Sequence, residues 1–362
     1  MNKRIIIAGG GTGGHIFPAI AIANALRKEN PWIKILFVGA KGKMEMEKVP
    51  QAGYDIKGID IVGFNRSNIF KNILLPFKLF KSYGQVADIF SEFNPDAVIG
   101  VGGYSSFPVL SYAQHKKLPT FIHESNSFAG KANKRLGKKA TRIFVGSDGM
   151  STFFPPEKIM VTGNPVRTSI LGSKITREEG IRFFGLDPAR KTILSIGGSL
   201  GAKSINEAVE AGIKELTKDN LQLIWQTGKP YAARAAEYAV ENKSVWANAF
   251  INDMEYAYAA ADVVISRAGA MAIAELCVMK KPVLFVPYPY AAEDHQTVNA
   301  QNLVNKNAGL MIKDSEAKEK LVPSIVALAK DEARQEELRA NIGKLAVTNA
   351  DEVIAAEILK LV

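Results

Sequence analysis

A glycine-rich segment near the start of the chain, GGGTGGH at residues 9–15, could bind an anion and place a base beside it. It contains the spacing G-x-G-x-x-G (Gly9, Gly11, Gly14) directly after an apolar run that is typical of a strand. Glycines let a backbone approach a phosphate closely, and the helix expected to follow offers its positive N-terminus. His15 is then either a base or hydrogen-bond partner beside the anion, or a structural residue that joins loop to helix.

Three further glycine-containing turns also follow apolar runs. They are VGGYSSFP at 101–108, GGSLGA at 197–202 and SRAGAMAIAE at 266–275. A single turn of this kind is usually just a tight connection between strand and helix. Four of them, each at the carboxyl end of an expected parallel strand, predict one ligand-binding cleft between two domains.

The absence of several well-known motifs excludes some classes of nucleotide-binding enzyme. The expected strand at 35–38 is followed by Gly39, Ala40 and Lys41, with no acidic residue to hold a ribose, which counts against a nicotinamide enzyme. The chain has no G-x-x-x-x-G-K-[ST] sequence and no Asp-x-Asp pair, so a P-loop kinase and a carboxylate clamp for a metal-bound sugar nucleotide are excluded. A departing diphosphate would need backbone amides, a helix N-terminus and a cation such as Arg167.

Two polar positions in the second half could bind a sugar. Glu275 lies in an apolar helical pattern, where it is either a solvated helix residue or an acceptor for two ribose hydroxyls. The segment EDHQTVN at 293–299 concentrates hydrogen-bonding groups suited to sugar hydroxyls, although a capped helix start favours the same residues.

The elements that position these residues alternate between short β-branched runs and longer helical patterns, which predicts βαβ units and parallel sheets. Expected strands lie at 4–8, 35–38, 97–101, 120–123, 142–145, 192–196, 221–226, 245–250, 263–266, 283–286 and 309–312. Helical patterns include 18–29 and 202–216. The strand–glycine–helix order at residue 5 returns at residue 192, so we expect two doubly wound domains. Their bounds are 1–164 plus a C-terminal helix at 344–362, and 165–343.

Composition agrees with a globular cytoplasmic protein. The chain has 362 residues, one cysteine (Cys277) and four histidines, which excludes an intramolecular disulfide and makes a structural zinc site improbable. It has no apolar run of about 18 residues that would span a bilayer.

The positive charge is one-sided. Residues 1–164 hold 22 Lys and Arg against 11 Asp and Glu, a net charge of +11, whereas residues 165–362 hold 24 against 25. A basic half of this kind indicates an anionic partner. The segment 64–81 mixes bases (Lys71, Lys78, Lys81) with bulky apolar side chains, as in a surface helix that rests on anionic lipid, or in a core-facing helix with a basic outer side. Pro76 argues against one long helix there.

Seven ordered motifs resemble the MurG family of bacterial enzymes, in glycosyltransferase family 28. They are GGGTGGHIFPA, GVGGYSSFP, HESN, TGNPVR, GGSLGA, SRAGAMAIAE and EDHQTVNA. The resemblance implies an α/β protein of the GT-B class, with two Rossmann-like domains facing across a cleft. The first, with the last helix, would bind the acceptor and the membrane, and the second the UDP-sugar donor.

The same resemblance implies an inverting hexosyltransferase. It would move N-acetylglucosamine from UDP-N-acetylglucosamine to the 4-hydroxyl of the N-acetylmuramyl-pentapeptide unit of undecaprenyl-linked lipid I. The product, lipid II, serves peptidoglycan synthesis, cell shape and cell division. The enzyme would lie peripherally on the cytoplasmic face of the inner membrane, beside other cell-wall and division proteins. No cofactor and no nucleic acid are expected, and the role of a divalent ion is left open.

Site residues follow from the resemblance by matching motifs. Donor contacts are implied for Arg167, Ser199 (diphosphate), Ile251 (backbone to uracil), Ala270, Met271, Ala272, Ile273 and Ala274 (phosphate), Glu275 (ribose) and Gln296 (sugar hydroxyls). Thr12, Gly13, Gly14 and Asn126 would complete the donor site from the first domain. His15, Tyr104, His123 and Glu124 would line the acceptor side, with His15 the favoured general base and Glu124 the alternative.

Other functions stay open at this point. One is a different GT-B enzyme, such as a glycolipid glycosyltransferase or a UDP-sugar epimerase. Another is a nucleic-acid-binding protein that uses the basic half, although the chain lacks aromatic ribonucleoprotein motifs and zinc-finger spacing.

Overall fold

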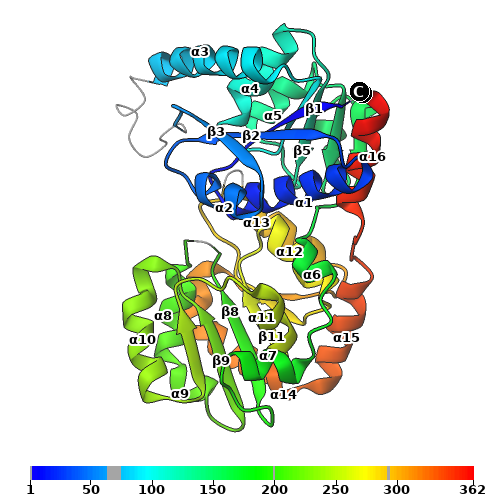
Figure 1. Cartoon of the computed structure of the whole chain (residues 1–362). Helices are drawn as coiled ribbons and strands as arrows, with labels where there is room; N and C mark the ends of the chain where they lie inside the picture. The colour runs from blue at the N-terminus through cyan, green and yellow to red at the C-terminus, as the bar shows by residue number, and fades with distance from the viewer. Residues whose placement is uncertain (1, 63–74, 199, 292–293) are drawn as a thin grey trace. The chain divides into compact units, whose positions relative to one another are not determined.

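The computed structural model describes residues 2–62, 75–198, 200–291 and 294–362. The chain divides into two compact units, drawn in Figure 1. The first unit comprises Met1–Arg167 and Asn349–Val362, and the second comprises Thr168–Thr348. Residues 349–362 therefore return to the first unit, after the part of the chain that forms the second unit.

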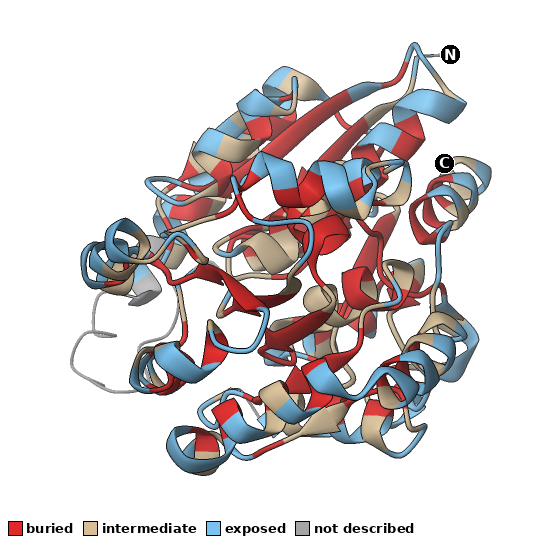
Figure 2. Ribbon diagram, turned by 90° about the horizontal axis from the view of Figure 1, so that it is seen from below, coloured by how far each residue is buried: buried red, intermediate tan, exposed pale blue. Residues whose placement is uncertain are grey.

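A seven-stranded parallel sheet forms the centre of the first unit, in the order β3-β2-β1-β4-β5-β6-β7. Its strands are β1 (Arg4–Ala8), β2 (Lys34–Ala40), β3 (Asp55–Ile59), β4 (Ala97–Gly100), β5 (Thr120–Glu124), β6 (Arg142–Val145) and β7 (Ile159–Val161). The inner strands are buried on both faces, as Figure 2 shows, so they are almost continuously apolar.

Helices cover both faces of this sheet. They are α1 (Gly13–Glu29), α2 (Glu45–Gln51), α3 (Leu75–Phe93), α4 (Ser106–His115), α5 (Lys131–Gly137) and α16 (Ala350–Leu361). Residues of α3, α4 and α5 pack on one face, around Ile6 and Val98. Residues of α1, α2 and α16 pack on the other, around Ile5 and Phe37. Successive residues of one strand therefore pack into hydrophobic clusters on opposite faces of the sheet.

The second unit repeats this plan with six parallel strands, in the order β10-β9-β8-β11-β12-β13. They are β8 (Lys191–Ile196), β9 (Leu221–Gln226), β10 (Val245–Asn248), β11 (Val263–Ser266), β12 (Val283–Phe285) and β13 (Leu310–Met311). Taken from its own first strand, the order is 3-2-1-4-5-6, which the first unit shares and which defines a Rossmann-like sheet. The expected doubly wound architecture is confirmed.

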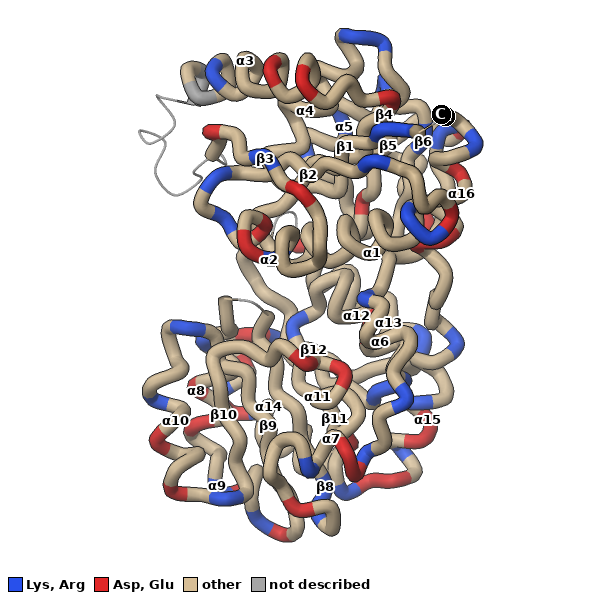
Figure 3. The backbone as a smooth tube through the Cα atoms, viewed as in Figure 1, with Lys and Arg blue, Asp and Glu red and all other residues tan. Residues whose placement is uncertain are grey.

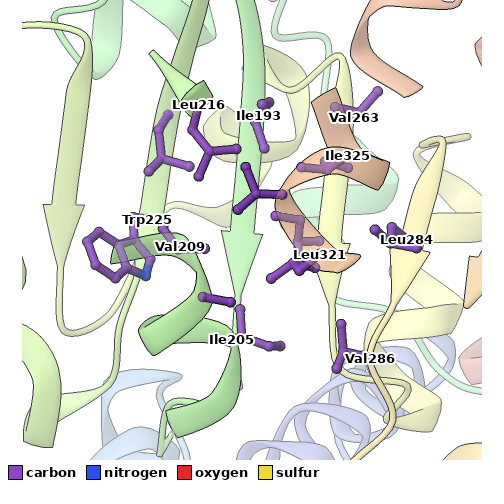
Figure 4. Packing of buried hydrophobic residues seen from close by; sticks show 14 of the residues in the cluster. Ile193, Ile205, Val209, Leu216, Trp225, Val263, Leu284, Val286, Leu321 and Ile325 are labelled. Carbon is purple, nitrogen blue, oxygen red and sulfur yellow. The ribbon is translucent and has the colours of Figure 1, made fainter. Parts of the chain in front are cut away.

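Ten α-helices are described in the second unit. They are α6 (Thr168–Leu171), α7 (Arg177–Phe183), α8 (Lys203–Ala211), α9 (Ile213–Leu216), α10 (Ala232–Glu241), α11 (Met254–Ala260), α12 (Ala270–Val278), α13 (His295–Val304), α14 (Ala317–Lys330) and α15 (Glu332–Gly343). Figure 4 shows Ile205 and Val209 of α8 and Leu321 and Ile325 of α14 packed against the strands. Trp225 is fully buried at the edge of this cluster.

Some expected boundaries were wrong. The helical pattern at 202–216 breaks into α8 and α9 at Gly212, where a Cβ would lie 2.6 Å from Val322 Cγ2 of α14. The final helix begins at Ala350 rather than at residue 344. Two strands, β3 and β7, were not expected at all.

The mixed apolar and basic segment at 64–81 is described only in part. Residues 63–74, and with them Lys71, lie outside the described residues. The rest forms the start of α3, which takes Pro76 into its first turn, where a missing N–H costs no hydrogen bond. Within the described part of the chain, no helix combines the length and apolarity that crossing a bilayer requires.

Candidate functional site

The first glycine segment forms the connection between β1 and α1, at the carboxyl edge of the sheet. Gly9, Gly10 and Gly11 have φ values of 155°, 145° and 90°. The loop rests on the turn after β4, because Gly10 N donates to the carbonyl oxygen of Gly102 at 3.3 Å. A Cβ on Gly103 would lie 2.4 Å from the carbonyl oxygen of Gly10. Two of the predicted glycine turns are therefore brought together here.

His15, in the first turn of α1, has one ring nitrogen committed to the loop. Its Nδ1 lies 3.0 Å from the carbonyl oxygen of Gly10. Because a carbonyl oxygen only accepts, Nδ1 carries the proton, which leaves Nε2 of the neutral ring as the basic site. Desolvation lowers the pKa of His15, and the carboxylates of Glu124 and Glu45 partly oppose that shift. A neutral imidazole is the form that a general base needs.

Glu124 ends β5, and its carboxylate is occupied by its own loop. One oxygen accepts from the backbone N–H and the side-chain amide of Asn126, both at 3.2 Å. The other accepts from Gly130 N at 3.1 Å and from Asn133 Nδ2 at 2.9 Å. The side chain thus holds the loop that follows β5, and four donors compete for the electron pairs that a base would use.

The two aromatic residues expected on the acceptor side differ in position. Tyr104 lies over the first loop, since a Cβ on Gly11 would come 3.8 Å from its ring. His123 is only 1% exposed and offers an acceptor no surface. Burial lowers the pKa of His123 to about 4, and His15 adds to the shift. Neither ring nitrogen completes a hydrogen bond, although Gly163 and Asn164 lie near enough to oppose the shift.

The third predicted glycine turn connects β8 to α8 in the second unit. Gly198 and Gly201 have φ values of 80° and 78°. A Cβ on Gly201 would lie 2.1 Å from the carbonyl oxygen of Thr227, so only glycine lets the loop rest on the end of β9. Gln226 Nε2 donates to the carbonyl oxygen of Gly198 at 2.9 Å. Ser199, the expected diphosphate contact, lies outside the described residues.

The fourth turn leads from β11 into α12. Gly269 is the N-cap of α12. The first turn of this helix contains no acidic residue, so no carboxylate of that turn neutralises the partial positive charge at the helix N-terminus. The five residues expected at a phosphate, Ala270, Met271, Ala272, Ile273 and Ala274, are all partly exposed. Glu275 follows them but is 6% exposed and accepts a hydrogen bond from Tyr258 Oη at 2.9 Å.

Three further expected donor contacts lie in different places. Gln296 lies in the first turn of α13, and its Oε1 accepts from Tyr288 N at 3.0 Å. Ile251 is 3% exposed in the loop after β10, so its backbone is the part that could meet a base. Arg167 belongs to the first unit, with its guanidinium carbon 4.7 Å from the centre of the Phe17 ring.

Among the buried charged residues that the sequence did not single out are Glu45 in the first unit and Arg267 in the second. Arg267 follows β11 and donates to the carbonyl oxygens of Val286 at 2.9 Å and Pro287 at 3.1 Å. It also pairs with Asp314 at 2.5 Å and donates to Ser204 Oγ at 3.0 Å. It thereby joins the carboxyl ends of β11 and β12 to the start of α8. A charged residue directly after an apolar strand was the available signal.

Among the described residues, no three His, Cys, Asp or Glu side chains are grouped so that they could hold a metal ion. That no cofactor is required stays a prediction.

A tandem of Rossmann-like units with glycine turns and a helix N-terminus at the carboxyl edges is the architecture of GT-B glycosyltransferases. The chain belongs to glycosyltransferase family 28. The N-terminal domain of that family matches residues 5–145, and its C-terminal domain matches residues 192–354. The chain is thus a glycosyltransferase, as the motifs predicted.

Curated relatives carry a more specific name. A UDP-N-acetylglucosamine–N-acetylmuramyl-(pentapeptide) pyrophosphoryl-undecaprenol N-acetylglucosamine transferase of Phocaeicola vulgatus is 52% identical, over 99% of this chain and 96% of that protein. A protein of the same name from Bacteroides fragilis is 49% identical, over 99% of this chain and 95% of its own length.

Solved structures agree on the architecture. The crystal structure of Acinetobacter baumannii MurG matches with a TM-score of 0.75 and 27% identity, over 99% of both chains. A UDP-N-acetylglucosamine 2-epimerase matches with a TM-score of 0.68 and 15% identity, over 100% of this chain and 97% of that one. At that identity the second match reports the fold alone.

Proposed function

We propose that this protein transfers N-acetylglucosamine from UDP-N-acetylglucosamine to the 4-hydroxyl of the N-acetylmuramyl-pentapeptide unit of lipid I, giving lipid II. The carrying observation is the 52% identity, over almost the full length, to a transferase whose name states this donor sugar and this lipid-linked acceptor. Peptidoglycan synthesis is then the pathway that the enzyme serves.

The second unit binds the donor in this proposal. The N-terminus of α12, whose first turn has no acidic residue, and the glycine turn after β8 would bind the diphosphate. Glu275, already held by Tyr258, would accept the ribose hydroxyls, and Gln296 would contact the sugar. Arg267 is given no phosphate in this proposal, and its hydrogen bonds to two carbonyl oxygens, Ser204 and Asp314 hold the strand ends instead.

The first unit binds the acceptor and supplies the base. Nε2 of His15 takes the proton of the 4-hydroxyl while that oxygen attacks the anomeric carbon of the donor. The bond from that carbon to the UDP oxygen breaks in the same step, and its electron pair leaves with UDP. The attack comes from the opposite side, so the configuration inverts. Positioned base catalysis of this kind contributes about 10²–10⁴ in rate.

Glu124 acts on the loop in this proposal. Its four hydrogen bonds hold Asn126 and the segment up to Asn133 beside the acceptor side. His123 is buried in β5, the strand that Glu124 ends. Both would position the site, and neither would move a proton.

The first unit also docks on the membrane in this proposal. Phe77 and Phe80 of α3 are 74% and 83% exposed, and the half of the chain that contains them carries a net charge of +11. The Lys and Arg positions are drawn in Figure 3. Exposed aromatic rings and bases are what a peripheral contact with an anionic leaflet uses. The location is the cytoplasmic face of the inner membrane, where lipid I is available.

The activity test supplies the purified protein with UDP-N-acetylglucosamine, radiolabelled in the sugar, and synthetic lipid I. We expect label in the lipid fraction and a β-linked product by NMR. Label in UDP-N-acetylmannosamine would identify an epimerase, and transfer to diacylglycerol instead of lipid I would identify a different glycolipid synthase. Either result overturns the proposal.

The membrane test measures sedimentation with phosphatidylglycerol vesicles. Replacing Phe77 and Phe80 by serine should weaken binding several-fold, because their burial in the lipid interface is lost. Val240→Ser is the control, since Val240 is 87% exposed on α10 of the second unit. Equal effects of both variants would exclude α3 as the docking element.

A further inference from the structure

Glu45 is a buried carboxylate beneath the first glycine loop, and it has no role so far. It begins α2, is 1% exposed and comes from an element that carries no predicted site residue. A carboxylate is costly to bury unless donors satisfy it, so its surroundings indicate what it does.

Its two oxygens join two strand ends. Oε2 accepts from Gly11 N at 2.8 Å, and Oε1 accepts from Ala40 N, at the end of β2, at 2.9 Å. The carboxylate thereby fixes the middle of the glycine loop to the neighbouring strand. Hydrogen bonds to a charged acceptor are stronger than those between neutral groups.

The sequence leaves space for this carboxylate. A Cβ on Gly10 would lie 2.3 Å from Glu45 Cδ, and a Cβ on Gly39 would lie 2.4 Å from Glu45 Cγ. The side chain of Glu45 therefore requires glycine at both position 10 and position 39. The first glycine loop therefore packs around the carboxylate of Glu45, a negative charge supplied by the protein itself.

That charge lies close to His15. Glu45 and Glu124 both raise the pKa of His15 against the larger lowering by burial, and His123 is the other titratable group that interacts with it. Glu45 also fixes the loop whose Gly10 carbonyl holds His15 Nδ1. It therefore acts on His15 in two ways, by its field and through the loop.

We propose that Glu45 is a positioning residue for the proposed transfer: its carboxylate fixes the glycine loop and stabilises the protonated ring that His15 becomes as it takes the hydroxyl proton. The inference rests on the proposed role of His15. It assigns Glu45 no contact with either substrate. The proton of the acceptor hydroxyl goes to His15 Nε2 and not to Glu45.

The test compares Glu45→Gln with Glu47→Gln. Both lie on α2, but Glu47 is 68% exposed at its side chain and touches only Lys48 and Gln51 among the described contacts. Glutamine removes the charge and turns one acceptor into a donor that faces an N–H. We expect the pKa of His15, followed by NMR of the four histidines, to fall in Glu45→Gln and to stay in Glu47→Gln.

Kinetics complete the test. Turnover of Glu45→Gln should fall about tenfold near neutral pH, with the acidic limb of the pH–rate profile displaced to lower pH, because a less basic ring is a weaker base. Glu45→Asp keeps the charge but is too short to reach both N–H groups. The pKa of His15 in this variant should stay near its value in the natural protein, and the KM for the acceptor should rise. If Glu45→Gln does not fold, Glu45→Asp still tests the proposal.

Two outcomes are distinguished. If the pKa of His15 and the acceptor KM are unchanged in both Glu45 variants, Glu45 has no positioning role and the inference is overturned. If His15→Gln retains turnover while Glu45→Gln still moves the pKa of His15, the proposed base is wrong, but the contact between loop and carboxylate stands.

Discussion

The two units carry the same glycine turn at the same place in the same sheet, yet its surroundings differ. The turns follow β1 and β8, the strands at which both sheets reverse their order. Around the first turn, two acids and two histidines interact electrostatically, namely Glu45, Glu124, His15 and His123. Around the second lie neutral amides, with Gln226 and Asn206 donating to the carbonyl oxygens of Gly198 and Thr227.

This difference separates two kinds of chemistry. In the first turn, Gly11 gives its N–H to a buried carboxylate, so an anion there would meet a negative charge below the loop. In the second, the described neighbours of the turn include no buried carboxylate that takes a loop N–H, and the uncompensated end of α12 belongs to the same unit. A glycine pattern specifies a backbone shape, and residues from other elements decide whether that shape serves proton transfer or phosphate binding.

The largest expected effect is the loss of turnover when His15, beside the first turn, is replaced. His15→Gln keeps a donor toward Gly10 but lacks a base, so kcat should fall about 10²–10³-fold. The affinity for UDP, measured by calorimetry, should stay within twofold, because UDP binds the second unit. An equal loss in both quantities would mean that the first turn binds nucleotide.

The next effect tests the second unit at Arg267. Arg267→Met leaves Asp314 and two carbonyl oxygens without their donor, and breaking a buried pair costs about 3–5 kcal/mol. Urea unfolding should show this loss together with weaker UDP binding, while the pKa of His15 stays unchanged.

Arg182→Met is the matched control for that variant, because Arg182 pairs with Glu178 at an exposed position of the same unit. It should change the free energy of unfolding by less than about 1 kcal/mol. Comparable losses in both variants would mean that Arg267 does not hold the strand ends.

A smaller effect appears as acid sensitivity of the first unit. The pKa of His123 is about 4 in the folded chain and about 6.5 when unfolded, so the unfolded ring binds protons more readily between these values. Lowering the pH from 6.5 to 4 should therefore remove about 3 kcal/mol of stability through this residue.

Urea titrations at pH 7, 5.5 and 4 check this dependence. His123→Asn should lose less stability over that interval than the natural chain does. His115→Asn, at an exposed position of α4, should lose as much as the natural chain. Identical pH profiles for all three proteins would show that His123 titrates normally.

The sequence predicts the inner strands well because they are buried on both faces. The expected bounds 4–8, 142–145, 221–226 and 263–266 agree with the structure at both ends. The missed strands β3 and β7 are edge strands: the first alternates exposed and half-buried residues around Lys57, and the second has only three residues. Such segments become strands through pairing with a neighbour, a contact that local pattern does not contain.

The site was predictable where chemistry follows local spacing. The glycine turns follow the strand ends, and His15 lies in the helix after the first of them, as their motifs indicate. Glu45 was not predictable, since it reaches Gly11 from 34 residues further along the chain. The four donors that occupy Glu124 were equally hidden, because the order GluSerAsn suggests a free acid as readily as a loop anchor.

The discontinuous first unit has a consequence for synthesis on the ribosome. Ile354 and Ile358 of α16 complete the core against α1, and Glu352 and Glu357 pair with Lys28 and Arg142. The earlier part of the first unit therefore emerges with an apolar surface uncovered, and this surface stays uncovered until residues 350–361 have been synthesised. A nascent chain arrested before residue 350 should then bind chaperones that the released protein no longer needs.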